Sequence, residues 1–166
     1  MPPRVTLHVR NVLEEERPVL ARLLTERWGS TRIASRDRVH DASAAEAFVA
    51  VRDDDEIVGA ATFVVRDEEA ELLTLDAIFE GEGVGGALVD AVARAAALAG
   101  ARRLVLSTTN DNLRALGFSQ RRGFKLEALR AGAVDRARTR KPQIPLVGSS
   151  GIPIRDELVL VRNLVG

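Results

Sequence analysis

The sequence predicts a single α/β domain whose central sheet contains both antiparallel and parallel strand pairs. Two observations support this prediction. Apolar segments of strand length, separated by charged turns, follow one another through residues 48–79, which favours an antiparallel meander. A glycine-rich turn and an alanine-rich helix then connect residues 71–79 to another apolar segment at 103–107. A strand–helix–strand unit of this length implies a parallel pair.

Length and composition limit the classes of function. At 166 residues, one domain spanning the whole chain is expected. Basic and acidic residues number 24 each, so nothing indicates nucleic acid or an anionic membrane as a partner. No apolar run is long enough to span a bilayer, and the N-terminal residues do not resemble a signal peptide. Cysteine is absent, which excludes disulfides, thiol catalysis and cysteine-ligated zinc. We expect a cytoplasmic protein without a metal site, and the abundance of alanine and arginine suggests a bacterial source.

The N-terminal third begins with alternating apolar and polar residues at 5–10, typical of a half-buried strand. Leucines at helical spacing predict a helix over residues 14–28, which Gly29 ends. Residues 30–45 are polar, and we expect them to be irregular, apart from helical turns around 42–45.

Strands are expected at 48–52 and 57–66, joined by an acidic hairpin turn, and a second charged turn leads into the strand at 71–79. The alanine-rich helix covers residues 84–99, and Gly100 stands in the position of a C-terminal capping glycine. The same criteria predict five later elements: strands at 103–107, 124–129 and 155–164, and helices at 112–122 and 132–141.

The glycine-rich turn at residues 80–86 is the strongest functional signal. Glycines let a backbone approach a ligand closely, and the first turn of a helix offers unpaired N–H groups at a positive dipole end. A phosphate or pyrophosphate suits such a site. A tight turn with no ligand is the alternative, and the glycines alone do not decide.

Two common phosphate loops can be compared with this turn. It lacks the lysine of a Walker loop. Gly81, Gly83 and Gly86 have the spacing of a dinucleotide fingerprint, but the loop lies midway along the chain rather than after the first strand of a parallel array.

Two blocks of the sequence resemble the GNAT superfamily of acyl-CoA-dependent N-acyltransferases. The Gly83-Val84-Gly85 turn resembles the acetyl-CoA signature [Gln/Arg]-x-x-Gly-x-[Gly/Ala]. The family's second block, N-x-x-A-x-x-F-Y-x-x-x-G-F, is similar to a run that starts at Asn112 and ends at Phe124. The resemblance implies a GNAT-type mixed, twisted sheet of six to seven strands with helices on both faces. It also implies direct transfer of an acetyl group from acetyl-CoA to a primary amine in a ternary complex.

The resemblance also implies which residues contact the cofactor. Backbone N–H groups at the start of the helix would hold the CoA pyrophosphate. The edge of the preceding strand would bond the pantetheine arm, in a gap where that strand and the next splay apart. Asn112 would contact the cofactor's amide arm, or else cap the following helix. The implied cofactor-binding residues are Leu73, Leu75, Asp76, Ala77, Glu80, Gly81, Glu82, Gly83, Val84, Gly85, Gly86 and Asn112.

The chain departs from the family pattern at two places. Glu80 stands where the family carries Gln or Arg, and with Glu82 it places two carboxylates near a pyrophosphate. We expect both side chains to point to solvent and the affinity to be weakened. Ser119 stands at the position of the family's general-acid tyrosine, and the chain contains no tyrosine. Because a proton shuttle contributes about 10² to 10⁴ in rate, we expect slow or water-assisted turnover.

Other candidate residues have both a functional and a structural interpretation. Glu71 is the first candidate for the base that deprotonates the amine, or else a strand-start carboxylate facing solvent. Asp76 is the alternative base, or else it orients the turn. Trp28, Arg36 and His40 are candidates for acceptor binding, and His40 could also be a base. A lone helical tryptophan is usually a packing residue, so the alternative for Trp28 is a core or lid anchor. The alternative for Arg36 and His40 is a residue without a role.

The acceptor itself is not identified by the sequence, which leaves small-molecule and peptide amines open. Two other functions compete with catalysis. The domain could bind or sense acyl-CoA without turnover, since it has lost the tyrosine, or it could be a structural or dimerisation domain with an empty cleft. A homodimer is compatible with the sequence, which does not decide the oligomeric state.

Overall fold

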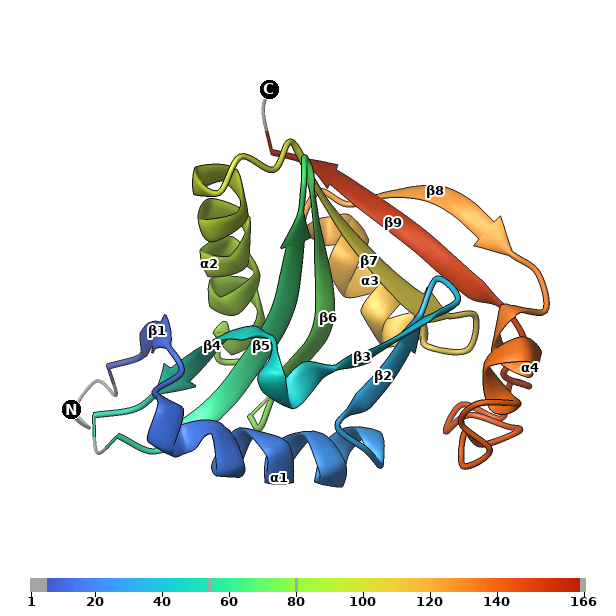
Figure 1. Cartoon of the computed structure of the whole chain (residues 1–166), viewed down its shortest axis with the longest axis horizontal. Helices are drawn as coiled ribbons and strands as arrows, with labels where there is room; N and C mark the ends of the chain where they lie inside the picture. The colour runs from blue at the N-terminus through green and yellow to red at the C-terminus, as the bar shows by residue number, and fades with distance from the viewer. Residues whose placement is uncertain (1–5, 54, 80, 165–166) are drawn as a thin grey trace.

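The computed structural model describes residues 6–53, 55–79 and 81–164. These residues form a seven-stranded sheet in the order β1-β4-β5-β6-β7-β9-β8, shown in Figure 1. All neighbouring strands are antiparallel except β6 and β7, which are parallel, so the prediction of a mixed sheet is confirmed. The strands of this sheet are β1 (His8–Asn11), β4 (Glu46–Val51), β5 (Ile57–Arg66), β6 (Glu69–Ala77), β7 (Arg103–Thr109), β8 (Lys125–Arg130) and β9 (Glu157–Asn163).

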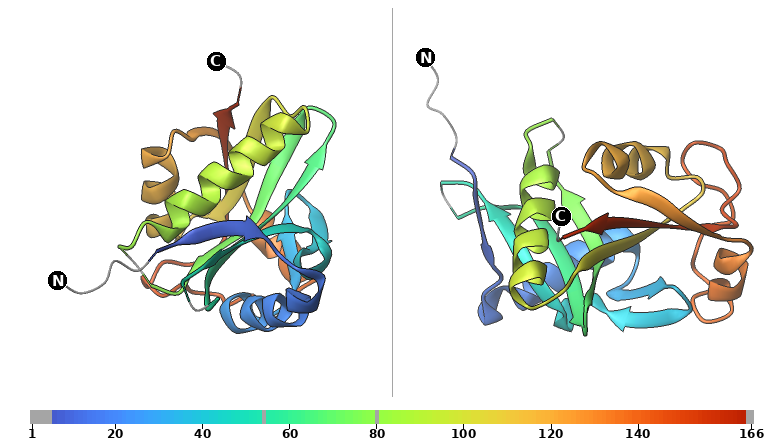
Figure 2. Two further views of the ribbon diagram at one scale, coloured as in Figure 1. Left: turned by 90° about the vertical axis from the view of Figure 1, so that its left-hand side faces the viewer. Right: turned by 90° about the horizontal axis from the view of Figure 1, so that it is seen from above.

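Helices cover both faces of the sheet, as predicted. On one face, α2 (Val84–Leu98) and α3 (Leu113–Arg121) pack over a core that continues into the middle strands. On the other face, α1 (Arg17–Trp28) packs over a second core. The two views of Figure 2 show these layers on either side of the strands.

The first helix is shorter than predicted because a 3₁₀ turn, η1 (Glu14–Glu16), precedes it. Pro18 lies in the first turn of α1, where its missing N–H is not needed. The helix ends as predicted at Gly29, which has a φ of 78°.

The prediction that residues 30–45 are irregular is wrong. They contain a hairpin of β2 (Arg32–Ser35) and β3 (Arg38–Asp41), followed by a 3₁₀ turn, η2 (Ala42–Ala44), which matches the expected helical turns. The two residues of the hairpin turn, Arg36 and Asp37, have φ angles of 48° and 64°. Tight hairpins require this conformation, but Asn-Gly or Asp-Gly usually supplies it, so the sequence carried no turn signal.

Later elements lie where they were predicted, with shifted ends. β7 continues to Thr109, two residues beyond its predicted end. The helix predicted at 132–141 is the shorter α4 (Ala133–Arg138). Among the described residues, no helix has the length and apolar character needed to cross a membrane, and no group of side chains suited to a metal ion is found among them.

Close packing between α2 and the sheet depends on Gly59 of β5. A Cβ atom added there would lie 2.6 Å from Val84 Cγ1 and 2.7 Å from the carbonyl oxygen of Asp76. The second of these atoms belongs to the backbone of β6, which cannot move aside easily. Gly59 therefore fixes how closely the start of α2 approaches β5 and β6.

We expect Gly59→Ala to lower the free energy of unfolding by about 1–3 kcal/mol, because the added methyl group overpacks this contact. Gly117→Ala in α3 is the matched control. Its Cβ would lie 3.0 Å from the mobile guanidinium of Arg121, so it should stabilise the helix by up to about 1 kcal/mol. Urea denaturation measures the free energy of unfolding of both variants relative to wild type. A change of the same sign in both variants would contradict the role given to Gly59.

Candidate functional site

The sheet opens between its two parallel strands. The ladder between β6 and β7 ends, within the described residues, at the pair Leu72–Leu106. Beyond this point β6 stays paired with β5 as far as Ala77, and β7 stays paired with β9 as far as Thr109. The backbone of β6 after Leu72 is therefore without a ladder partner on the β7 side, at the place where a gap between these strands was predicted.

A β-bulge lies where the opening begins. Thr62 of β5 faces Thr74, but the next residue, Phe63, faces Leu72, so Leu73 is an extra residue in β6. A bulge bends its strand and increases the local twist. It also reverses which side chains face each side of the sheet. As a result, Glu71 before the bulge and Asp76 after it both face the side of α1 and the β2–β3 hairpin.

The start of α2 lies beyond the end of β6, and no side chain of a described residue caps it. Gly81 and Gly83 have φ angles of 77° and 78°, and Gly83 is the N-cap. No acidic residue lies in the first turn of the helix. The carboxylate of Glu82 is exposed to solvent, as expected, and also accepts from Arg52 Nη2 at 2.7 Å. Glu80, the other predicted loop carboxylate, lies outside the described residues. This helix end therefore has the uncapped N–H groups that bind an anion.

Two side chains of α3 lie against this helix end. A Cβ added at Gly85 would lie 3.4 Å from Phe118 Cζ, and one added at Gly86 would lie 2.2 Å from Arg122 Nη2. The Arg122 guanidinium also lies 5.5 Å from the centre of the Phe118 ring. Among the described residues no carboxylate pairs with Arg122, so its positive charge adds to that of the helix end.

Sequence reasoning missed Arg122 as a candidate anion contact. Its position carried a usable signal, because it follows Phe118 of the second block by four residues and therefore continues the same helical face. Asn112 was predicted either as a cofactor contact or as a cap, and the cap is present. Its Oδ1 accepts a hydrogen bond from Ala115 N at 3.1 Å.

Ser119, the predicted substitute for a general acid, is only 3% exposed and is the buried residue of α3. A short hydroxyl in this position has little contact with solvent, from which a proton could be relayed. Its participation in proton transfer stays a prediction.

Glu71 lies at the closed end of the opening. Its side chain is 5% exposed, so the alternative that it faces solvent is wrong. Ser35 Oγ donates to Glu71 Oε1 at 2.5 Å, and Arg36 Nη2 donates to Oε2 at 2.9 Å. Ser35 Oγ is also 3.2 Å from the hydroxyl of Ser107, the first residue of β7 beyond the last ladder pair. Both oxygens of Glu71 are thus occupied, and its charge is balanced by Arg36.

Asp76 is a second buried carboxylate on the same face, further along the opened part of β6. It is 8% exposed, and Trp28 Nε1 donates a hydrogen bond to its Oδ2 at 2.8 Å. Burial raises the pKa of Asp76, although the hydrogen bond from Trp28 and the charge of Arg27 lower it in part. A carboxylate with a raised pKa is a stronger proton acceptor near neutral pH. Two residues predicted separately, Trp28 and Asp76, therefore form one unit.

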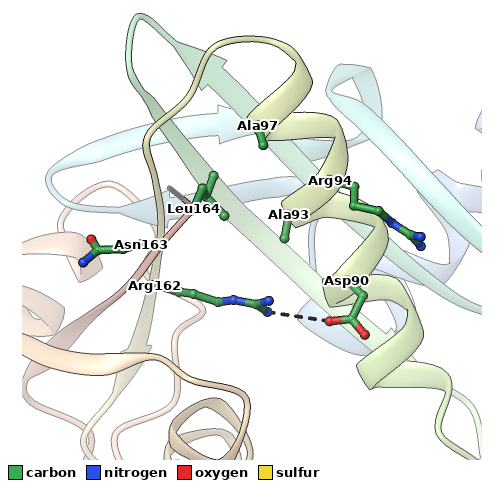
Figure 3. A pocket seen from close by; sticks show the side chains of 7 residues that line it. All are labelled: Asp90, Ala93, Arg94, Ala97, Arg162, Asn163 and Leu164. Carbon is green, nitrogen blue, oxygen red and sulfur yellow. Dashed lines mark ion pairs between the residues drawn. The ribbon is translucent and has the colours of Figure 1, made fainter. Parts of the chain in front are cut away.

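Two hollows lie outside the opening between β6 and β7. One, of about 280 Å³, lies between the β2–β3 hairpin and the β5–β6 turn, and the predicted acceptor residues Arg36 and His40 line it. The other, of about 410 Å³, lies between α2 and the end of β9. Figure 3 shows the ion pair between Asp90 and Arg162 at its edge, 3.6 Å long. Neither the glycine turn nor a predicted site residue lines this second hollow.

Comparisons with known proteins agree with this geometry. Residues 12–124, more than half of the chain, match the sequence model of the acetyltransferase (GNAT) family. The uncharacterized protein YxbD of Bacillus subtilis (strain 168) is 37% identical over 137 residues, which cover 82% of this chain and 86% of YxbD.

Solved structures show the same fold at low sequence identity. A Bacillus subtilis acetyltransferase in complex with CoA is 18% identical with a TM-score of 0.70, covering 98% of this chain and 100% of its own. A GNAT family acetyltransferase from Elizabethkingia anophelis with acetyl-CoA bound is 20% identical with a TM-score of 0.65, covering 96% of this chain and 97% of its own.

The buried Asp76 generates a prediction about stability. Burial raises the pKa of the Asp76 carboxyl in the folded state. The folded protein therefore binds the proton of this carboxyl more tightly than the unfolded chain does. Stability due to this group therefore falls as pH rises through the raised pKa. Asp76→Asn keeps an oxygen that accepts from Trp28 but removes the buried charge.

We expect Asp76→Asn to have a higher free energy of unfolding than wild type at neutral pH. The difference should shrink as pH falls and should vanish below the ordinary pKa of aspartate, where the side chain is neutral in the folded and the unfolded state. Chemical denaturation at several pH values measures it. A variant that is less stable at neutral pH would show that the ionised carboxylate is stabilising here.

Proposed function

Because the chain belongs to the acetyltransferase (GNAT) family, we propose that it transfers an acetyl group from acetyl-CoA to a primary amine of a small molecule or peptide. The amine attacks directly in a ternary complex, and no covalent enzyme intermediate forms. The observation that carries this proposal is the opening beyond Leu72 and Leu106 beside the uncapped start of α2. An extended cofactor arm fits the first feature and a diphosphate fits the second.

Residues on both sides of the opening would hold the cofactor. The N–H groups of Val84, Gly85 and Gly86 would bind the diphosphate, together with the guanidinium of Arg122. The free backbone edge of β6, residues 73–77, would bond the amide arm as an added strand does. The pairing of Glu82 with Arg52 supports this arrangement, because it neutralises a carboxylate that would otherwise repel the diphosphate. When bound, acetyl-CoA supplies a reactive thioester carbonyl and a thiolate leaving group.

We assign the removal of the amine proton to Asp76, with Glu71 as the alternative. A new carbon–nitrogen bond forms as the carbon–sulfur bond breaks, and the proton from nitrogen goes to the carboxylate, which then releases it to water. The thiolate takes a proton from water, directly or through the Ser119 hydroxyl, which water reprotonates. Burial raises the pKa of Asp76, whereas Glu71 already accepts from Ser35 and Arg36. A raised proton affinity improves a general base. Both oxygens of Glu71 are already engaged as hydrogen-bond acceptors, which leaves Asp76 as the freer carboxylate.

A second function, binding or sensing of acyl-CoA without turnover, is favoured by one observation. The position of the usual tyrosine holds Ser119, which is buried. A domain that binds the cofactor but lacks a proton donor for the thiolate would release product slowly or not at all. Cofactor binding and thiol release therefore have to be measured separately.

Calorimetric titration with acetyl-CoA tests the cofactor site. We expect Arg122→Gln to weaken binding roughly tenfold or more, because a charge-assisted hydrogen bond is lost. Arg121→Gln, at the adjacent and likewise exposed position, is the control for loss of one charge and should bind like wild type. Absence of binding by the wild type would remove the cofactor proposal, and binding without thiol release across a panel of amines would favour sensing.

The pH dependence of acetyl transfer tests Asp76. The base must be ionised, so the rate should fall as pH drops through the raised pKa. Trp28→Phe removes a hydrogen bond that lowers the pKa of Asp76, and we therefore expect the acidic limb of the rate profile to move to higher pH. Asp76→Asn should reduce kcat by about 10² to 10⁴.

The kcat of Glu71→Gln is compared with that of Asp76→Asn to test the assignment of Asp76 as the base. An unchanged acidic limb in Trp28→Phe, together with a large loss of kcat in Glu71→Gln, would transfer the role of base to Glu71.

A further inference from the structure

We propose that the pocket between the β2–β3 hairpin and the β5–β6 turn binds an acidic group of the acceptor, a carboxylate or a phosphate. The acceptor would then be an amine that also carries a negative charge. This inference rests on the proposed function, because it names the substrate class of the same site. The pocket has a volume of about 280 Å³, enough for such a group and part of its side chain.

Unpaired nitrogen atoms in the pocket wall are the first argument. Arg36 Nε and His40 Nε2 are buried, and neither has a hydrogen-bond partner among the described residues. Both residues line the pocket. Buried polar atoms in native proteins are nearly always hydrogen-bonded, and an exception needs an explanation. A bound group with acceptor oxygens would satisfy the N–H of Arg36 and, in the appropriate tautomer, that of His40, once these side chains turn toward the pocket that they line.

The charge balance of the pocket is the second argument. Two of its carboxylates are already paired, since Arg36 Nη2 lies 2.8 Å from Glu69 Oε1 and 2.9 Å from Glu71 Oε2. Arg38 and Arg66 also line the pocket, and no carboxylate pairs with either among the described residues.

Asp67, in the β5–β6 turn, is the remaining carboxylate and is exposed. Three arginines and three carboxylates line the pocket, but two of the carboxylates share Arg36. Among the described residues that line the pocket, this leaves Arg38 and Arg66 facing Asp67 alone. The exposed side of the pocket, formed by these last three residues, therefore carries one excess positive charge. Guanidinium groups bind carboxylate and phosphate through two parallel hydrogen bonds, which suits both proposed ligand groups.

The position of the pocket is the third argument. Glu71 lines it and also lies at the closed end of the opening, where Ser35 links it to Ser107. The pocket is on the hairpin side of the sheet, whereas α2 and the glycine turn are on the other side. An amine held by its acidic group at Arg38 and Arg66 would therefore extend past Glu71 toward the opening, from the side not used by the cofactor.

Matched pairs of amines test this inference. The common L-amino acids are compared with their carboxamides, and phosphoethanolamine with ethanolamine, as acceptors for acetyl transfer. We expect the wild type to prefer one class of acidic amine over its uncharged partner. Arg66→Gln and Arg38→Gln should each raise KM for that class roughly tenfold to hundredfold with little change in kcat, because binding of the charged group is lost. KM for the uncharged partners should not change.

Arg94→Gln, an exposed residue of α2, is the control for loss of one positive charge and should behave like wild type. Equal use of acidic and uncharged amines by the wild type would overturn the inference, as would an equal effect of Arg66→Gln on both members of a pair. A preference for amino acids would identify the bound group as a carboxylate, and a preference for phosphoethanolamine would identify it as a phosphate.

Loss of the acetyl-transfer proposal can be told apart from loss of the proposed anion site. Thermal-shift titration with the same compounds, in the presence of CoA, measures binding without turnover. Stabilisation by acidic amines that disappears in Arg66→Gln, with no acetyl transfer to any amine, would support the anion site and contradict the catalytic proposal. Acetyl transfer without any stabilisation specific to acidic amines would support the catalytic proposal and contradict the anion site.

Discussion

The early end of the β6–β7 ladder is the constraint on which the candidate site depends. Interior strands of a sheet normally pair on both edges, because unpaired backbone groups are costly away from water. Here the pairing ends at Leu72 and Leu106, although both strands continue and remain paired on their outer edges. The bulge at Leu73 bends β6 away at this point, so the opening follows from one extra residue. A free backbone edge inside a sheet is suited to receiving an extended ligand, which is the property that the proposed function uses.

The same bulge places two buried carboxylates on one face in different surroundings. Glu71 is neutralised by Arg36 and bonded by Ser35. Within the described part of the chain, the neutral N–H of Trp28 is the one side-chain donor to Asp76, and burial raises the pKa of this carboxyl. Two carboxylates of one site whose oxygens have different hydrogen-bond partners can be assigned different roles. Glu71 then holds the closed end of the opening together, and Asp76 is available to take a proton.

How much the sequence could predict depended on how local each signal was. The glycine turn, the α2 helix and the parallel pair of strands lie within one continuous segment, and their patterns predicted them correctly. The cap formed by Asn112 was also foreseen, because its partner Ala115 is three residues away. The pairing of Trp28 with Asp76 spans 48 residues, and no local pattern indicates it. Nor does the bulge at Leu73 have a signal of its own, since it is defined only by the register with β5.

The β2–β3 hairpin shows why the acceptor side was the less predictable half. Its turn residues, Arg36 and Asp37, are held in a left-handed conformation by contacts from distant segments rather than by their own preference. Arg130 of β8 pairs with both Asp37 and Glu157, and Glu157 in turn accepts from the backbone N–H of Arg36. Arg140, after α4, donates to the carbonyl of Asp37. The wall of the acceptor pocket, which residues between 36 and 71 form, is therefore held in place by the C-terminal part of the chain, while the proposed cofactor half is built mainly from residues 72–86. A change near residue 130 or 157 should thus alter acceptor binding by displacing the hairpin while leaving the cofactor half intact.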